Sequence, residues 1–216
     1  MALAVDLDCL RLTTRSPKTM SKARIVIAED EGIVRLDLRE TLQEEGYEVV
    51  GETARGDEVV QLVEKTNPDV AILDVKLPGE DGISVARKLS ARGDVAILML
   101  TAFSQRQVVS EAIEAGALGY LVKPFQRSEL APAIEVALAR HRDMKALERQ
   151  RRDLEEALET RKVVERAKGK LMQERGLSEA EAYRAIQKSA MQRRLTMKKV
   201  AELILDGSIT AGSSDF

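Results

Sequence analysis

The 216-residue chain contains no tryptophan and only three tyrosines and three phenylalanines. This shortage excludes nucleic-acid binding by a row of stacked aromatic side chains. The single cysteine, Cys9, cannot form an internal disulfide, and the single histidine, His141, excludes a metal site built from several histidines. The sequence has no apolar run of about 18 residues, so we predict no membrane span and expect a cytoplasmic protein.

Charged residues are plentiful, and their two signs are unevenly distributed. The whole sequence has a net charge of −2. Residues 142–206 contain 17 basic and 12 acidic residues, whereas the remainder contains 17 basic and 24 acidic residues. Within residues 161–199 the basic excess grows to 12 against 4. An acidic module joined to a basic one indicates a polyanionic partner for the second module.

Residues 23–140 alternate short apolar segments with longer amphipathic ones. The apolar segments are predicted to be five buried strands, at 25–28, 47–50, 69–73, 95–100 and 119–122. The amphipathic segments are predicted to be five helices, at 33–45, 57–65, 83–91, 105–115 and 128–140. Near-continuous apolar strands separated by helices indicate a sheet covered on both faces. We therefore predict an α/β doubly wound domain with a five-stranded parallel sheet.

Residues 141–160 lack glycine and proline and are predicted to form a coiled-coil linker helix. A weak seam is indicated because Leu147, Leu154, Arg161 and Lys168 recur every seven residues. A solvated connecting helix explains the same segment equally well. Residues 1–22 and 207–216 have no hydrophobic periodicity and are predicted to be disordered tails.

Residues 161–206 are predicted to form a small three-helix domain. The first helix ends at Gly176, and Ser178 and Glu181 have the spacing of a capping box that begins the second. Thr196 is expected to cap the third helix. The positions predicted to face the core of this domain are Ala182, Ile186, Ala190, Met197, Val200, Ala201 and Ile204.

Polar side chains follow four of the five predicted strands. Glu29 and Asp30 follow the first strand, Asp74 the third, Thr101 the fourth and Lys123 the fifth. The carboxyl ends of parallel strands meet at one edge of the sheet, so these side chains are expected to converge. Converging carboxylates repel one another unless a cation neutralises them, and Mg²⁺ prefers oxygen ligands. A magnesium site beside a further carboxylate suits phosphoryl transfer.

Four segments carry a family resemblance. They are residues 25–31, Asp74-Val-Lys-Leu-Pro-Gly-Glu-Asp-Gly82, Leu100-Thr101-Ala102 and Tyr120-Leu-Val-Lys123-Pro124-Phe125. Together they resemble the receiver domain of bacterial two-component response regulators, over residues 22–141. The resemblance implies a flavodoxin-like fold for residues 23–140.

The resemblance also implies that Asp74 is the phosphoacceptor of a sensor histidine kinase. Glu29, Asp30, Asp74 and the main-chain carbonyl of Lys76 would hold Mg²⁺. The family often has two aspartates where this chain has Glu29-Asp30. We expect the longer glutamate to change the affinity for Mg²⁺ rather than to abolish the site.

Three further residues match the family's switch. Lys123 would pair with the phosphoryl group, and Thr101 would turn its hydroxyl toward that group. Tyr120 stands where the family has its switch aromatic, although a half-buried strand tyrosine with a solvated hydroxyl is an equally good interpretation. Phe103 and Phe125 are predicted to be packing residues.

The basic module has two cationic clusters. In the first, Lys162, Arg166 and Lys170 recur every four residues along a predicted helix. The second comprises Arg193 and Arg194, followed by Lys198 and Lys199. A cationic helix face is most often solvated surface, but the regional charge favours binding of a polyanion.

The segments Glu165-Arg-Ala-Lys-Gly-Lys-Leu-Met172, Ala180-Glu-Ala-Tyr-Arg-Ala-Ile186, Ser189-Ala-Met-Gln-Arg-Arg194 and Val200-Ala201 resemble the ANTAR domain, over residues 155–206. This resemblance implies RNA binding and prevention of transcription termination, and the whole chain is similar to actinobacterial antitermination regulators. The family works as dimers on paired RNA stem-loops. The predicted RNA contacts are Arg166, Lys168, Lys170, Arg193, Arg194 and Lys198. Ala167 and Gly169 are predicted to be small for close helix packing. Tyr183 could stack on a base, but packing in the core with a solvated hydroxyl is the favoured interpretation.

We therefore predict a regulator rather than an enzyme. A sensor histidine kinase would phosphorylate Asp74, the modified receiver would favour a homodimer, and bound RNA stem-loops would let RNA polymerase read through. Two alternatives are a DNA-binding transcription regulator and a phosphorylation-controlled coiled-coil adaptor. A third is a haloacid-type phosphohydrolase, but this chemistry usually needs a second acid two residues after the nucleophile, where this chain has Lys76.

Overall fold

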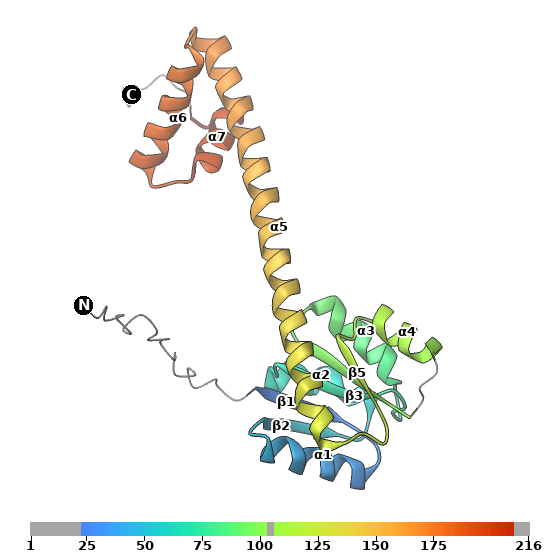
Figure 1. The fold of residues 1–216 in the computed structure, drawn as a ribbon. Helices are drawn as coiled ribbons and strands as arrows, with labels where there is room; N and C mark the ends of the chain where they lie inside the picture. The colour runs from blue at the N-terminus through green and yellow to red at the C-terminus, as the bar shows by residue number, and fades with distance from the viewer. Residues whose placement is uncertain (1–22, 103–105, 210–216) are drawn as a thin grey trace, which may run out of the picture. The chain divides into compact units, whose positions relative to one another are not determined.

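The computed structural model describes residues 23–102 and 106–209 (Figure 1). The predicted tail 1–22, most of the predicted tail 207–216, and Phe103 lie outside these residues. The chain divides into two compact units, Met1–Asp143 and Met144–Phe216. Among the described helices, none combines the length and the low polarity that crossing a membrane requires.

The first unit is built on a five-stranded parallel sheet with the strand order β2-β1-β3-β4-β5. This arrangement confirms the predicted doubly wound sheet. Apolar residues, many of them β-branched, fill the three central strands, which are buried on both faces. The strands are β1 (Arg24–Ala28), β2 (Glu48–Thr53), β3 (Val70–Asp74), β4 (Ala96–Thr101) and β5 (Gly119–Val122).

Helices cover both faces of this sheet (Figure 1). One face packs against α2 (Gly56–Thr66), α3 (Gly82–Arg92) and α4 (Arg106–Glu114). The other face packs against α1 (Gly32–Glu44) and the beginning of α5 (Arg127–Arg175). Alternate residues of each central strand enter the two cores, so both faces are apolar.

Helix α5 is a single helix of 49 residues. It joins the helix predicted at 128–140 to the long helix predicted from residue 141 to the stop at Gly176, because no glycine or proline interrupts residues 133–168. The helix ends where Gly176 adopts a left-handed conformation, with φ of 66°. The leucines of the predicted seam, Leu147 and Leu154, are exposed, as is Leu158.

The second unit packs the end of α5 against α6 (Glu179–Arg193) and α7 (Met197–Leu205). The capping box of Ser178 and Glu181 is confirmed, and the Thr196 hydroxyl caps α7 by accepting from the Lys199 N–H. The predicted inward positions are also confirmed. The core of the unit contains Val164, Ala167, Leu171, Ala182, Ile186, Ala190, Val200, Ala201 and Ile204.

Candidate functional site

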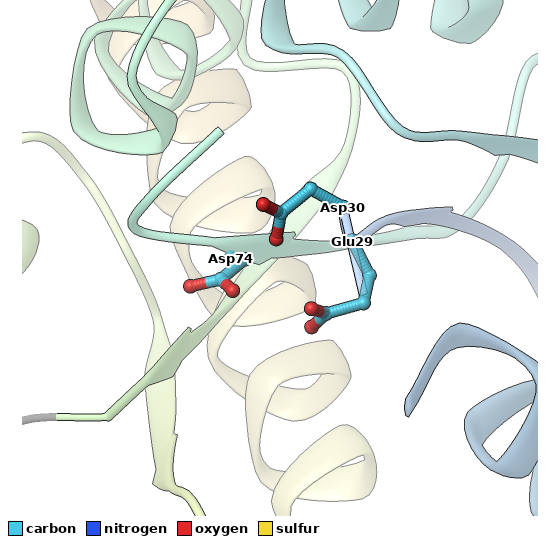
Figure 2. A group of neighbouring side chains, drawn as sticks. All are labelled: Glu29, Asp30 and Asp74. Carbon is cyan, nitrogen blue, oxygen red and sulfur yellow. The ribbon is translucent and has the colours of Figure 1, made fainter. Parts of the chain in front are cut away.

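Three carboxylates meet at the carboxyl edge of the sheet. Glu29 and Asp30 directly follow β1, and Asp74 is the last residue of β3, the neighbouring strand. One carboxylate oxygen from each residue lies within 4.8 Å of the others (Figure 2). Glu29 and Asp74 are buried, whereas Asp30 is exposed. The predicted convergence of these acids is therefore present in the fold.

Lys123 neutralises part of this charge. Its ammonium lies 2.6 Å from Asp74 Oδ2 and 2.6 Å from Glu29 Oε2. Burial raises the pKa of the Glu29 carboxyl, Lys123 opposes this rise, and the charge of Asp74 adds to it. Burial alone would lower the pKa of Lys123, but its hydrogen bonds to Asp74 and Glu29 raise it above its usual value. Lys123 therefore stays charged at neutral pH.

The backbone around Asp74 fixes the direction of its side chain. The Lys76 N–H donates to Asp74 Oδ1 over 3.1 Å. The start of α3 approaches closely, because a Cβ on Gly82 would lie 1.9 Å from the Asp74 carbonyl oxygen. Asp81 caps α3 by accepting from the Ser84 N–H. Only glycine at position 82 permits this approach, which keeps Asp74 at a fixed place beside the edge.

The residues present fit a hard divalent cation. Mg²⁺ takes oxygen ligands, and Glu29, Asp30 and Asp74 offer three carboxylates. Glu29 Oε2 is buried, and the Lys123 ammonium lies 2.6 Å from it. One ammonium beside three carboxylates leaves excess negative charge, which a divalent cation would neutralise. The oxygens of these three side chains are thus candidate ligands, with Lys76 beside them.

The other predicted switch residues lie at the ends of neighbouring strands. Thr101, the last residue of β4, is buried, and the Lys123 N–H donates to its carbonyl oxygen over 2.8 Å. Tyr120 in β5 is about half exposed and pairs in register with Met99. Phe125 packs against the core beneath α1 and α5, which confirms its predicted packing role.

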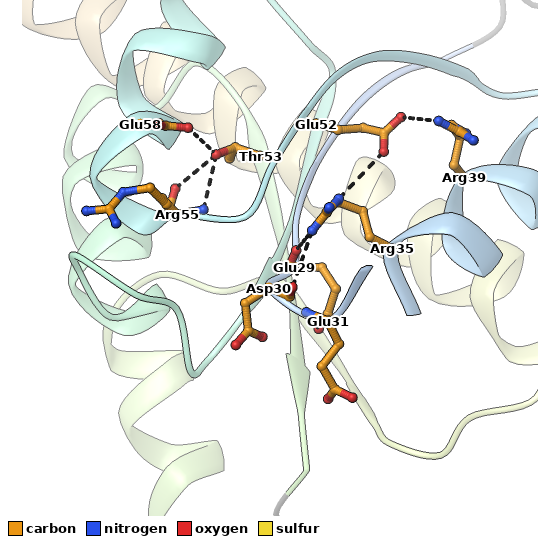
Figure 3. Close-up of polar contacts among 9 residues, drawn as sticks. All are labelled: Glu29, Asp30, Glu31, Arg35, Arg39, Glu52, Thr53, Arg55 and Glu58. Atoms are coloured by element: carbon orange, nitrogen blue, oxygen red, sulfur yellow. Dashed lines mark hydrogen bonds and ion pairs between the residues drawn. The ribbon is translucent and has the colours of Figure 1, made fainter. Parts of the chain in front are cut away.

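Arg35 is a site residue that the sequence analysis missed. Its guanidinium donates to the carbonyl oxygen of Glu29 and, over 3.5 Å, to that of Asp30 (Figure 3). The same side chain lies 3.9 Å from Glu52, which also pairs with Arg39. A cation in the first turn of α1 opposes the helix dipole. A basic residue at this unfavourable position of a helix indicates, from the sequence alone, that its side chain has a partner outside the helix.

The predicted RNA contacts separate into two groups in the second unit. Lys168 is only 7% exposed, and its ammonium lies 2.9 Å from Glu165 and 2.7 Å from Glu179. Lys170 donates to the carbonyl oxygens of Ile204 and Leu205, over 2.8 and 3.2 Å. These two lysines hold α6 and α7 against α5.

The remaining candidates have free side chains. Among the described residues, no hydrogen bond or ion pair engages the side chains of Arg166, Arg193, Arg194 and Lys198. Arg193 and Arg194 end α6, and Lys198 lies in the first turn of α7. Lys198 acts electrostatically on Glu159 of α5, which pairs with Lys162. Cations of α5 and α7 thus share one surface.

Two expectations for this unit are wrong. Gly169 is exposed, and a Cβ added to it would meet no atom of the described structure within 4 Å, so it does not serve close packing between the described helices of one chain. Tyr183 is 43% exposed and lies outside the core. Both misjudgements have one reason: a sequence shows the spacing of small and aromatic residues, but not the side of the helix that receives a neighbour. Ala167 is fully buried, as predicted.

Comparisons with known proteins agree with this architecture. Residues 25–135 match the response regulator receiver domain, and residues 152–205 match the ANTAR domain. The solved structure of a two-component response regulator of the LuxR family from Aurantimonas sp. SI85-9A1 is similar, with a TM-score of 0.52 and 38% identity. That similarity covers 55% of this chain and 86% of the solved chain.

Two curated relatives show the extent of the similarity. The transcriptional regulatory protein PdtaR of Mycobacterium tuberculosis (strain CDC 1551 / Oshkosh) is 52% identical over 183 residues, which cover 85% of this chain and 89% of the relative. The chemotaxis protein CheY of Bacillus subtilis (strain 168) is 33% identical over 116 residues, which cover 53% of this chain and 97% of the relative. The chain therefore belongs to the response regulators, and it joins a receiver domain to an ANTAR domain.

Proposed function

We propose that a sensor histidine kinase phosphorylates Asp74 and that this modification controls RNA binding by the ANTAR domain. One observation carries the proposal: a single chain joins a buried carboxylate cluster, with a lysine 2.6 Å from Asp74, to a basic helical module. The first part suits a phosphoryl group, and the second suits a polyanion. The protein acts as a switch and not as an enzyme.

The chemistry at Asp74 follows from its neighbours. The P–N bond of a phosphohistidine breaks as a P–O bond to the Asp74 carboxylate forms, and the histidine nitrogen keeps the electron pair and takes a proton. The Lys76 N–H orients the attacking carboxylate, and Lys123 offsets the charge of the phosphoryl oxygens. Mg²⁺, held by Glu29, Asp30, Asp74 and the Lys76 carbonyl, would neutralise further charge on those oxygens.

The surface beside the cluster suits a docking kinase. Ile33, in the first turn of α1, is 86% exposed. It borders a hollow lined by Val34, Pro124 and Phe125, and Lys123 lies at the same hollow. Exposed apolar side chains rimmed by charge are typical of a protein-binding surface. A kinase bound here brings its phosphohistidine to the edge that carries Asp74.

Phosphorylation would redistribute the contacts of Lys123. A phosphoryl group on Asp74 attracts Lys123 more strongly than the carboxylate does, so Lys123 pulls away from Glu29. Thr101 turns its hydroxyl toward the new oxygens, and Tyr120 fills the space beside it. These movements change the surface around β4 and β5 and favour a homodimer, in which the exposed leucines of α5 form the coiled-coil seam.

The output is antitermination in the cytoplasm. Two ANTAR domains of a dimer bind paired RNA stem-loops through their free cations, and the stabilised RNA lets RNA polymerase continue. Arginine and lysine reach both the phosphates and the bases of an RNA loop, so few aromatic residues are needed.

The experiment is a selection for nucleic acid. The full chain, treated with acetyl phosphate and Mg²⁺, is offered a pool of RNA stem-loops with randomised loops and a matched pool of DNA duplexes. Enrichment of RNA by the wild type, and not by Asp74→Asn, is expected. Preference for duplex DNA would instead identify a DNA-binding regulator. Enrichment of neither pool would favour the coiled-coil adaptor.

A further inference from the structure

The segment Arg166–Lys170 arranges its side chains around α5 in an unusual way. Ala167 is buried in the core of the ANTAR module. Lys168 extends to Glu179 at the start of α6, and Lys170 extends to the last carbonyls of α7. The two lysines that flank Gly169 therefore bind within the module, on either side of the helix. Gly169 remains exposed between them.

Gly169 has no structural reason to be glycine. It lies well inside a helix, where glycine is less favourable than alanine because the unfolded chain has more freedom to lose. A Cβ at this position would meet no atom of the described residues within 4 Å. Its backbone is helical and not left-handed, unlike that of Gly176, so its conformation needs no glycine. Glycine makes the helix less stable at this position, and a ligand that approaches the backbone too closely for a Cβ would explain why it is present.

The neighbours of Gly169 indicate which ligand that is. Arg166 lies one turn earlier on the same side of α5, and its side chain has no partner among the described residues. Lys162, another turn earlier, is exposed and pairs with Glu159 on the helix surface. The exposed polar side chains of Arg166 and Gln173 flank Gly169 on the same side of the helix. A flexible phosphodiester strand can pass between such side chains.

We propose that Gly169 is the point where the RNA backbone comes closest to α5, and that Arg166 holds the adjacent phosphate. Lys168 and Lys170 are positioning residues that fasten α6 and α7 and do not touch RNA. This inference rests on the proposed RNA binding, and it assigns to that function a surface and a steric requirement. Of the three cations in the segment, Arg166 contacts a phosphate, whereas Lys168 and Lys170 stabilise the module.

The test measures RNA affinity and stability together. The probe is the tightest stem-loop that the wild-type protein selects from the randomised RNA pool, labelled with fluorescein. Gly169→Ala should weaken binding about tenfold, while the melting temperature of the protein stays the same or rises. Gln173→Ala, which trims a side chain on the same side of the helix, should bind like the wild type.

The dependence of RNA affinity on salt concentration distinguishes the cations that contact phosphate from those that do not. Each lost phosphate contact reduces the slope of log affinity against log salt concentration by about 0.7–0.9. Arg166→Gln should reduce the slope by about this amount. Lys170→Gln should lower the melting temperature and leave the slope of the folded protein unchanged.

Three results would overturn the inference and leave the proposed function standing. Wild-type affinity in Gly169→Ala would show that no close approach occurs at this position. Loss of dimer mass in Gly169→Ala, measured by light scattering, would assign the glycine to contact between two copies. An unchanged salt slope in Arg166→Gln would show that Arg166 contacts no phosphate. Failure of the wild type to select any RNA would overturn the proposed function itself, and the inference with it.

Discussion

The ammonium of Lys123 lies 2.6 Å from the carboxylate of Asp74, and both side chains are largely withdrawn from solvent. Glu29 shares the same ammonium at the same distance and is fully buried. One cation thus faces two carboxylates, which leaves the cluster with excess negative charge. The receiver domain holds this charge at the place where a divalent cation and a phosphoryl group are proposed to bind.

Removing the Lys123 ammonium should destabilise the receiver domain. In Lys123→Met the buried carboxylates of Asp74 and Glu29 lose their partner, and we expect the free energy of unfolding in EDTA to fall by about 3–5 kcal/mol. Urea unfolding followed by circular dichroism measures the change. Lys88→Met, which breaks a pair with Glu80 in which the lysine is exposed, is the control and should cost less than about 1 kcal/mol. An equal loss in both variants would contradict the structural role of Lys123.

Arg35 should matter for cation binding although it is not itself a ligand. It holds the main chain of Glu29 and Asp30, so Arg35→Met should weaken Mg²⁺ binding about tenfold, as loss of supporting contacts commonly does. Arg39→Met removes the other partner of Glu52 without touching this loop and is the matched control. The dissociation constant follows from the rise in melting temperature with Mg²⁺ concentration. Equal constants for both variants would argue against a positioning role.

The ANTAR domain should lose stability in acid. The hydrogen bond from Lys168 lowers the pKa of Glu179 below its ordinary value of 4.5. The folded state therefore binds this proton less tightly than the unfolded state does. The resulting stabilisation is complete above the ordinary pKa and is lost as pH falls through the lowered one.

Lys168→Met measures that contribution. The variant should melt several degrees below the wild type at pH 7, and the difference should shrink as the pH falls from about 4.5 toward 3. Lys162→Met is the control, since it removes only a pair between exposed residues of α5. A difference that is independent of pH would mean that Lys168 stabilises the domain by packing alone.

The exposed leucines of α5 should form a dimer seam in the phosphorylated protein. Leu154 is 72% exposed, and Leu147 lies seven residues earlier on the same side of the helix. Leu154→Glu should therefore keep the phosphorylated protein monomeric, as measured by light scattering. Arg149→Glu introduces the same side chain almost opposite the seam and should leave the dimer intact. A wild-type protein that stays monomeric after phosphorylation would contradict the seam.

Much of the fold was predictable because local pattern and global fold agree. The buried strands are nearly continuous apolar segments. Gly176 marks the end of α5, and the pair Ser178 and Glu181 marks the start of α6. The approach of Glu29, Asp30 and Asp74 also followed from the sequence, because parallel strands end at one edge. Helix α5 was predicted as a helix at 128–140 followed by a long helix from residue 141, and the structure shows that the two are continuous.

The parallel sheet, the acids at its edge and the basic composition of the ANTAR module all follow from the order of the residues. Which cations are free depends instead on how the helices pack. Lys168 and Arg166 look alike in the sequence, but the rotation of 100° per residue along α5 turns one into the module and leaves the other in solvent. Gly169 is exposed for the same reason. Arg35 reaches the Glu29 main chain because α1 begins just after the residues that follow β1. Residue type fixes what a side chain can bind, and the packing of neighbouring elements fixes what it meets.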